Sequence, residues 1–492
     1  MEQDYIKLIF GLKLKQIRTD KKLSLFGLSK LSGLSKSYLN EIEKGKKYPK
    51  TDKIAILSEK LDVPYDHFVS LKLDKNLAPI GELLRSNVLK EIPLELFGIK
   101  ESNLIDIVSK APAKVNAFIS TIIEIAQNYN FSRESFYLAS VRSFQEANNN
   151  YFDDLEEQVV KFAKAYQIDL SKPIETFELE EILVEEFNYT INNEELDKHN
   201  DLEDLRSVFI PKTKTLLLAN HVDEAQRTFI YAKELAYNFL QIEERLYTFP
   251  WIKFEKFDQV LNNFYASYFA GALIISRESI TKGLSELFEK DIFGLTDFNH
   301  LLNSFNVSPE SFYQRLTNVI PKDFNLQNLF FLRFNHKKGS EKFKLNKELH
   351  LSHQHSPRAN EVNEKYCRRW VSLKVLQEIS KGKKDHIFDI QISNYPAYNM
   401  KYLVLSSATK DPFKENQYRS ISIGLLINKQ LQRKVKFLTD SNIEHKDVGV
   451  TCERCAIPDC EQRQAPHTVL DKIAKNKKTA LLVEDLNDKF SI

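Results

Sequence analysis

The amino-acid sequence predicts a multidomain protein that is mainly α in its N-terminal half and α+β in its C-terminal half. The 492 residues exceed what one hydrophobic core usually contains, so several domains are expected. Apolar residues recur at helical spacing in the first 160 residues, and runs rich in β-branched and aromatic residues gather after residue 326. We therefore expect four segments, at 1–71, 76–160, 161–325 and 326–492, the second being a helical connector.

The composition is that of a soluble globular protein with one basic end. Hydrophobic residues make up 42% of the chain and charged residues 28%. Residues 1–70 carry 14 Lys and Arg against nine Asp and Glu, which is typical of a nucleic-acid-binding module. The N-terminus lacks the features of a signal peptide, and the apolar run Phe264–Ile275 is shorter than a membrane span of ~20 residues. We therefore expect a cytoplasmic protein without membrane contact.

Residues 1–71 are expected to form short helices joined by tight turns. Ser24 can cap the second helix, because its hydroxyl accepts a hydrogen bond from the first helical turn. Gly33 supplies the positive φ that a tight turn between helices needs. The residues expected to face the core from the first two helices are Phe10, Leu14, Ile17, Leu28 and Leu31.

The third helix of this head is the expected DNA-reading element. Ser35 can cap it, Gly45 can end it, and Leu34, Leu39 and Ile42 point inward. Its outward residues are small, polar or cationic, which suits phosphates and base edges in the major groove of double-stranded DNA. A helical hairpin that binds protein instead of DNA is the alternative. The residues expected to contact DNA are Ser35, Lys36, Ser37, Tyr38, Asn40, Lys44, Lys46 and Lys47.

The run from Ser35 to Gly45, of the form S-x-S-Y-x-x-x-I-E-x-G, resembles the lambda-repressor-like, or XRE, helix-turn-helix family. The resemblance implies a structural salt bridge between Arg18 and Glu43. The chain departs from the family at Leu25, where Gln is common, so the contact made there is in doubt. Since one such head reads only a half-site, a homodimer is expected.

Residues 161–325 are expected to contain a β-hairpin, 206–210 with 215–218, and helices from Asp223 and from about Phe257. The helix around Glu234 resembles the zinc helix of ImmA/IrrE-type metallopeptidases, whose H-E-x-x-H motif binds zinc through two histidines. Lys233 and Tyr237 stand where the histidines would be.

The same resemblance places Tyr265 where the family has its third ligand, a glutamate. A lysine and two tyrosines do not build a zinc site, so we expect no metal there and no enzyme activity. The segment then reads as a degenerate ImmA/IrrE-like domain whose helix serves the core. The residues expected to face inward from it are Phe229, Ala232, Leu235 and Phe239.

Residues 326–492 are expected to be rich in strands, with one helix among them. The expected helix is 368–379, and loops are expected at Asn394–Pro396 and at Lys410–Phe413. The expected strands are 330–334, 386–392, 402–406 and 420–427.

Three of the four cysteines lie within nine residues, as Cys452-x2-Cys455-x4-Cys460, and Cys367 lies 85 residues upstream. Clustered thiols in a chain with few cysteines indicate a metal site, and four thiolates suit either tetrahedral zinc or an iron–sulfur cluster. Spacing alone leaves that choice open, and four unligated thiols are the bland alternative. The possible substitute ligands are His353, His355 and His467.

The run Val448–Arg463, of the form V-G-x-x-C-x-x-C-x-x-x-x-C-x-Q-R, and the domain order resemble the short-chain fatty-acid-responsive regulators. That resemblance implies an acyl-CoA effector, a 4Fe-4S cluster on the four cysteines, and a GAF-like sensor fold for 326–492. The stretch Lys365–Trp370 is more basic than the family pattern. An iron–sulfur redox or oxygen sensor without acyl-CoA is the alternative, whereas the missing histidines argue against an active metallopeptidase regulator.

Overall fold

The computed structural model describes residues 2–71, 133–247, 256–351, 364–382, 384–411 and 414–490. Most of the expected helical connector lies outside these residues, as do His353 and His355. Contacts divide the chain into two units, Met1–Ser140 with Glu255–Phe257, and Val141–Phe254 with Asp258–Ile492. None of the described helices combines the length and the hydropathy that a membrane crossing requires.

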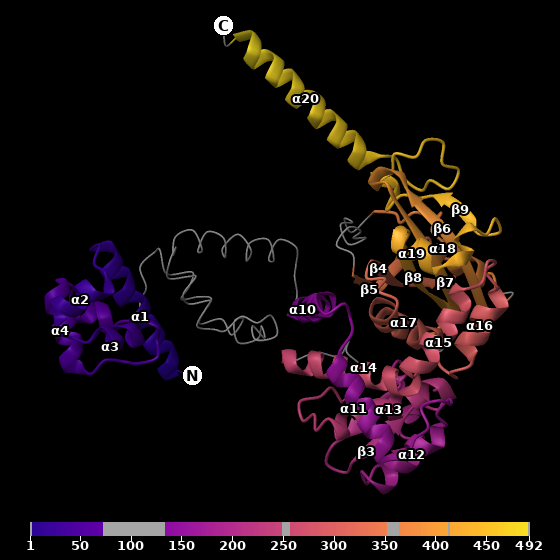
Figure 1. The fold of residues 1–492 in the computed structure, drawn as a ribbon, viewed down its shortest axis with the longest axis horizontal. Helices are drawn as coiled ribbons and strands as arrows, with labels where there is room; N and C mark the ends of the chain where they lie inside the picture. Colours follow the sequence, from indigo (N-terminus) through magenta and orange to yellow (C-terminus); the bar gives the residue numbers. More distant parts are fainter. Residues whose placement is uncertain are drawn as a thin grey trace. The chain divides into compact units, whose positions relative to one another are not determined.

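The head consists of short helices packed around one small apolar core (Figure 1). Phe10, Leu14 and Leu39 are buried in it, as the helical spacing predicts. Ile17 packs against its edge. The helices are α1 (Glu2–Asp20), α2 (Leu25–Ser32), α3 (Lys36–Glu43), α4 (Thr51–Leu61) and α5 (Tyr65–Val69).

The predicted cap and the predicted glycine turn of the head are confirmed, but one residue was wrongly assigned to the core. Ser24 caps α2 through the Gly27 amide, and Gly33 has a φ of 70°. Leu31 does not face the core, because its side chain is 44% exposed. Ser32 lies inside instead, where its hydroxyl donates to the Leu28 carbonyl at 2.7 Å and so loses no hydrogen bond on burial.

The second unit begins with helices and a three-stranded sheet. The predicted hairpin is confirmed as β2 (Ser207–Ile210) antiparallel to β3 (Thr215–Leu218). A third strand, β1 (Thr190–Asn192), pairs parallel with β3 and was not predicted. The helices of this region are α10 (Arg133–Ala147), α11 (Asp153–Ala165), α12 (Thr176–Glu185), α13 (Glu224–Phe239) and α14 (Phe257–Ile274). The predicted starts of α13 and α14 are therefore confirmed.

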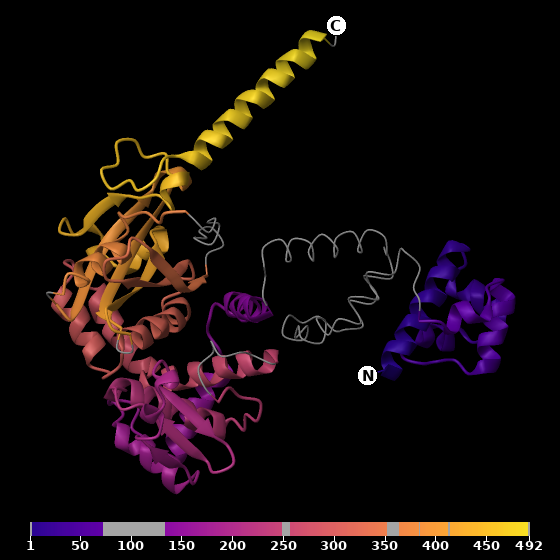
Figure 2. The same cartoon turned by 180° about the vertical axis from the view of Figure 1, so that it is seen from behind.

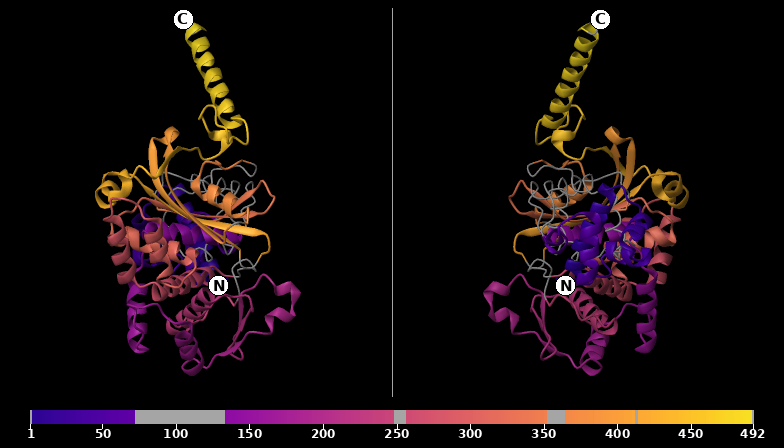
Figure 3. Two further views of the ribbon diagram at one scale, coloured as in Figure 1. Left: turned by 90° about the vertical axis from the view of Figure 1, so that its right-hand side faces the viewer. Right: turned by 90° about the vertical axis from the view of Figure 1, so that its left-hand side faces the viewer.

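A six-stranded sheet forms the centre of the C-terminal part, and Figure 3 shows it from two further sides. Its strand order is β5-β4-β8-β7-β6-β9, as labelled in Figure 1. All neighbouring strands are antiparallel except β6 and β9, which are parallel. The strands are β4 (Leu329–Lys337), β5 (Phe343–His350), β6 (His386–Tyr395), β7 (Met400–Lys410), β8 (Gln417–Leu426) and β9 (Glu444–Asp447).

Alternation along the strands gives this sheet two apolar faces, which helices cover. Phe331 and Ile423 pair across β4 and β8 and join the core on the side of α17 (Pro309–Asp323). Phe330 and Leu332 point to the other face, which α18 (Val371–Ile379) covers. Figure 1 labels α18, and Figure 2 shows the same sheet from behind. The other helices of this part are α15 (Arg277–Phe288), α16 (Leu295–Asn303), α19 (Lys429–Lys434) and α20 (Thr468–Phe490).

Several boundaries in the C-terminal part differ from the prediction. The loop expected from Asn394 starts later, because β6 continues to Tyr395 in register with β7. Lys410 is still the last residue of β7 rather than the start of a loop. The helix expected from Arg368 begins at Val371, since the preceding residues form a turn. The strands β5 and β9 and the long helix α20 were not predicted.

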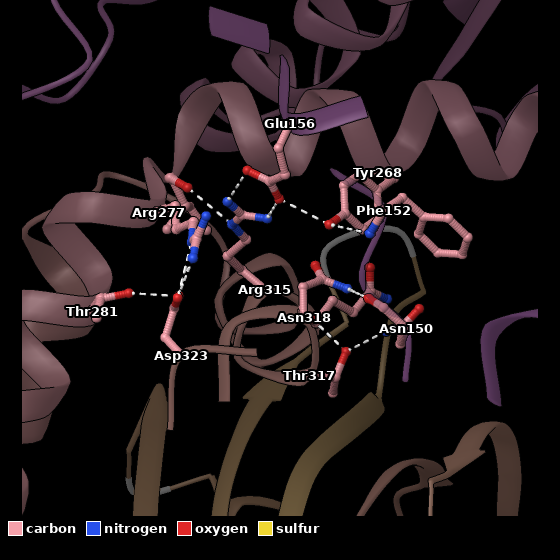
Figure 4. Close-up of polar contacts among 12 residues, drawn as sticks. Asn150, Phe152, Glu156, Tyr268, Arg277, Thr281, Arg315, Thr317, Asn318 and Asp323 are labelled. Carbon is pink, nitrogen blue, oxygen red and sulfur yellow. Dashed lines mark hydrogen bonds and ion pairs between the residues drawn. The ribbon is translucent and has the colours of Figure 1, made fainter. Parts of the chain in front are cut away.

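A buried polar network fastens α11 to α17 (Figure 4). Arg315, 1% exposed, donates to both carboxylate oxygens of Glu156 at 2.6 and 2.9 Å. The Tyr268 hydroxyl of α14 donates to the same carboxylate at 2.8 Å. Since α17 also packs against β4 and β8, this network holds the helices before the sheet to the sheet itself.

Candidate functional site

The N-terminal end of α3 presents a polar surface. The Ser35 hydroxyl accepts a hydrogen bond from the Tyr38 amide at 3.2 Å, so the predicted cap is confirmed. Ser35, Lys36 and Ser37 are exposed, and Tyr38 and Asn40 are half-buried. Leu39 and Ile42 are fully buried on the opposite side. This end of the helix therefore offers amide groups and small donors to an anion or a base edge.

Lysines extend this polar surface beyond the end of α3. Lys44, Lys46 and Lys47 are exposed, and Gly45 has a φ of 66° that turns the chain after the helix. The Lys47 ammonium lies 5.3 Å from the centre of the Tyr38 ring. The structure thus brings the predicted cationic residues to the same surface as the predicted base-reading residues.

The predicted pair of Arg18 and Glu43 is present and fixes α1 against α3. Arg18 donates through Nε and Nη2 to the two Glu43 oxygens at 2.6 and 2.9 Å. The two side chains are only 15% and 6% exposed. The hydrogen bonds to Glu43 raise the pKa of Arg18. The orientation of α3 is therefore set by a shielded two-pronged contact.

Two residues that the sequence reading overlooked complete this packing. A Cβ at Gly11 would lie 2.3 Å from the Ile42 carbonyl oxygen, so glycine allows α1 to approach α3 closely. Lys13 is 2% exposed, and its ammonium donates to the carbonyls of His67 and Ser70 at the end of α5. The sequence does not predict this contact, because Lys13 and the end of α5 are far apart along the chain and meet only in the fold.

In α13 the charged and polar side chains around Glu234 are bonded to one another and to neighbours. Glu234 and Arg245 form a buried pair, with Arg245 Nη2 at 2.6 Å from each carboxylate oxygen. The Tyr189 hydroxyl donates to Glu234 at 3.1 Å. A carboxylate held in this way is not available as a general base.

Lys233 and Tyr237, the residues expected in place of histidines, both contact Asn263 of α14. Lys233 donates to the Asn263 side-chain oxygen at 2.6 Å, and the Tyr237 hydroxyl does so at 3.4 Å. Burial lowers the pKa of Lys233 to about 8. Tyr265 lies on the same helix as Asn263, and burial raises its pKa. These positions therefore hold an ammonium group on α13 and phenols on α13 and α14, whereas zinc sites are built from Cys, His, Asp and Glu side chains.

The helix α13 is buried on more sides than the single apolar face that was expected. Ala232 and Leu235 are fully buried, as predicted, whereas Phe229 and Phe239 are only partly buried. Tyr231 on another face is fully buried as well. The one-sided pattern was therefore wrong, because α12 and the core surround the helix.

The four cysteines line one small cavity beside the start of α18. Cys367, Cys452 and Cys455 are buried, and Cys460 is half-buried. Burial raises the pKa of the Cys367 thiol to about 11. Three arginines line the same cavity, namely Arg368, Arg369 and Arg463. Thiols remote in sequence therefore meet at one cavity that is also lined by arginines.

Backbone hydrogen bonds hold the cysteine loop against the turn before α18. The Cys367 amide donates to the Val450 carbonyl at 3.1 Å, and the Cys452 amide donates to the Lys365 carbonyl at 2.9 Å. A Cβ at Gly449 would lie 2.7 Å from the Cys455 sulfur. Glycine at 449 is thus required for the loop to close over Cys455.

Arg463 fastens the far side of the loop. Its guanidinium donates to the carbonyls of Cys452 and Ile457 at 3.0 and 2.8 Å. The Gln464 amide donates to the Cys452 sulfur at 3.3 Å. His467 places its Nδ1 2.7 Å from the Cys455 carbonyl oxygen, so that nitrogen is engaged with backbone rather than with a metal.

The arrangement bears on the two kinds of metal site that four thiols allow. Within the described parts of the chain, no three His, Cys, Asp or Glu side chains are grouped as one metal ion requires. A zinc ion gathers its sulfurs within ~2.3 Å of one point, whereas an iron–sulfur cubane distributes four cysteines over several irons. Either kind of site would draw on the four thiols that line the cavity.

Comparisons with known proteins identify the head. Residues 14–68 match a helix-turn-helix family model. A Mycobacterium tuberculosis transcriptional regulator of known structure aligns with 66% of this chain and 93% of its own, at 16% identity and a TM-score of 0.46. A similarity at that TM-score does not support a functional inference. No curated protein matches this chain. The family match and the geometry of the head together support a DNA-binding transcriptional regulator.

Proposed function

We propose that the protein is a sequence-specific transcriptional regulator that reads double-stranded DNA through α3. The observation that carries this proposal is the exposed, capped N-terminal end of α3 within a helix-turn-helix head. The exposed lysines at 44, 46 and 47 follow it directly and can neutralise phosphates. Asn40 would read a base edge, since an amide side chain can form two hydrogen bonds at once with adenine.

Two substitutions separate base reading from phosphate contact. Asn40→Ala should weaken binding to the operator by ~1–3 kcal/mol, with the loss concentrated at one base position. Lys47→Ala should weaken binding to all duplexes about equally and reduce its salt dependence. Lys198→Ala serves as the control, because this exposed lysine lies in the other unit.

Fluorescence anisotropy with the upstream region of the protein's own gene, and with shuffled duplexes, would measure both effects. Equal affinity of the wild-type chain for native and shuffled duplexes would contradict sequence-specific reading. Unchanged binding by both head variants would contradict the assignment of α3.

The cysteine cavity supports a second part of the proposal, a 4Fe-4S cluster held by Cys367, Cys452, Cys455 and Cys460. Such a cluster would supply sensitivity to oxidation. The surrounding arginines would offset the negative charge of the thiolates, and Arg463 would keep the loop in shape around them. Zinc remains the alternative metal.

The proposal for the signal that the regulator senses rests on the sequence resemblance to the short-chain fatty-acid-responsive regulators, not on contacts in the structure. An acyl-CoA effector and a GAF-like sensor at 326–492 are proposed on that ground, and a single sheet with helices on both faces is compatible with such a fold. A cluster that senses redox state or oxygen without acyl-CoA is the second candidate, favoured by the half-buried Cys460. We also propose that the protein is cytoplasmic. We further propose that it has no enzyme activity, since the carboxylate of Glu234 is paired with Arg245 inside the protein.

Operator binding at several acetyl-CoA and propionyl-CoA concentrations, compared with air exposure and re-reduction, would separate these candidates. An affinity that follows the thioester at constant redox state supports the metabolite sensor. An affinity that follows oxidation alone supports the redox sensor.

A further inference from the structure

The C-terminal helix α20 lacks a covering partner within the described residues. From Asp471 to Phe490 every residue is exposed, and Figure 1 shows the helix extending away from the six-stranded sheet. The large apolar side chains of this stretch are at least half exposed, including Ile473 at 57%, Val483 at 50% and Phe490 at 79%. An exposed apolar surface of this kind is typical of an interaction site.

The net charge of α20 changes sign along the helix. Its first half carries four lysines, at 472, 475, 477 and 478, against Asp471, and its second half carries Glu484, Asp485 and Asp488 against Lys489. The basic half of one helix would therefore complement the acidic half of another that runs in the opposite direction. The helix is complementary to itself only when antiparallel.

The apolar residues of α20 contain a heptad stripe. Ile473, Ala480, Val483 and Phe490 follow one another at spacings of seven, three and seven residues, which is the repeat of a coiled-coil seam. Asn476 and Asn487 complete the stripe at its remaining positions. A polar asparagine in such a seam is a known device for fixing register.

We propose that α20 pairs antiparallel with α20 of a second copy of this chain. In one register Ala480 lies opposite the partner's Val483, Ile473 opposite the partner's Phe490, and Asn476 opposite the partner's Asn487. Lys477 then lies beside the partner's Glu484. Such a contact is the same surface on both copies, so it closes as a dimer.

A parallel pairing would be opposed by the same charges. Lys477 would then face the partner's Lys472, and the acidic halves would face each other. The antiparallel arrangement instead satisfies the apolar stripe, the asparagines and the charged halves together.

The base of α20 adjoins the cysteine loop. His467, which bonds the Cys455 carbonyl, directly precedes Thr468 at the start of the helix. The inference deepens the proposed function, because it supplies the second copy that a regulator with two half-sites needs. Its test requires no DNA, so failure of one proposal is distinguishable from failure of the other.

A pair of matched substitutions tests the stripe in the full chain. Val483→Asp places a carboxylate in the seam and should weaken the dimer at least tenfold, as measured by sedimentation equilibrium. Leu481→Asp is the control, because Leu481 is equally exposed at 52% but lies on the far side of the helix. It should leave the dissociation constant within about threefold of wild type, a difference of less than ~1 kcal/mol. Far-ultraviolet circular dichroism checks that both variants fold.

Charge reversal tests the direction of pairing. Lys477→Glu alone and Glu484→Lys alone should each weaken the dimer about tenfold, and the double variant should restore it. A stronger dimer for Lys477→Glu would indicate a parallel pair and overturn the proposal. A monomeric wild-type chain, or equal effects of Val483→Asp and Leu481→Asp, would also overturn it.

Discussion

The helix α13 and the cysteine cavity both gather chemically reactive side chains, but they satisfy them differently. In α13 the carboxylate of Glu234 takes two contacts from Arg245 and one from Tyr189, and Lys233 bonds Asn263. In the cavity the four thiols face a shared space, and the surrounding hydrogen bonds go mainly to backbone carbonyls. The polar side chains of the first site bond to one another inside the core, whereas the thiols of the second site line a cavity.

This difference shows why residue type alone does not identify a site. A buried glutamate in a family-like zinc helix and a cluster of cysteines are both suggestive in sequence. The bonding partners of each side chain distinguish the two cases, because a charge that is already neutralised within the protein interacts only weakly with a substrate or a metal. Substitutions at the two sites should therefore have different consequences.

The largest stability effect is expected at α13. Glu234→Gln would leave the buried guanidinium of Arg245 without its carboxylate, which should lower the free energy of unfolding by ~3–5 kcal/mol. Urea denaturation of the second unit measures it. Glu195→Gln is the control, because its pair with Lys198 is exposed to water and should contribute little to the free energy of unfolding. Equal losses in the two variants would contradict the structural role of Glu234.

A smaller effect is expected behind the cysteine loop. Glu364 is 5% exposed and accepts hydrogen bonds from Arg454 and from the Thr451 hydroxyl. Glu364→Gln should cost ~1–3 kcal/mol and loosen the loop, because one charge-assisted contact is lost. Asp459→Asn changes an exposed residue of the same loop and should be neutral. Hydrogen exchange of the loop amides would reveal the difference, and identical exchange in both variants would oppose it.

A dependence of stability on pH is expected at Lys233, and over any one pH unit it is the smallest of these effects. Its pKa in the folded chain is about 8, below the ordinary value of 10.5, so between those values the unfolded chain binds more protons. The contribution of Lys233 to stability therefore improves as pH rises from about 8 to 10.5, by on the order of 1 kcal/mol per pH unit. Lys233→Met should remove this slope, so the variant's stability relative to wild type should be highest near pH 7. A constant difference from pH 7 to 10 would argue against a buried, shifted lysine.

The sequence predicted those features that depend on local spacing. The caps at Ser24 and Ser35, the pair of Arg18 with Glu43, and the hairpin before α13 all follow from short motifs or from the resemblance. The exposure of Leu31 was not predicted. Ser32 occupies the inward position instead, because its hydroxyl donates a hydrogen bond to a carbonyl of its own helix.

Features that join distant segments could not be predicted in the same way. Arg245 lies beyond the end of α13 and meets Glu234 only through the fold. Gly449 is an ordinary loop glycine until Cys455 is seen to approach it. Cys367 shares a cavity with the other cysteines as the resemblance implies, but the hydrogen bonds that hold it there come from backbone, which a sequence does not display.

The most direct test of this comparison is the metal content of three proteins purified without oxygen. We predict that wild type and Glu234→Gln each hold about four iron atoms per chain, with the visible absorbance of a cubane cluster. Cys460→Ser should lose the iron, because the remaining thiols leave one corner of the cluster without its ligand. Gln462→Ala, which changes the lining of the same cavity but no thiol, should retain it. Full metal content in Cys460→Ser, or loss of metal in Glu234→Gln, would contradict the account.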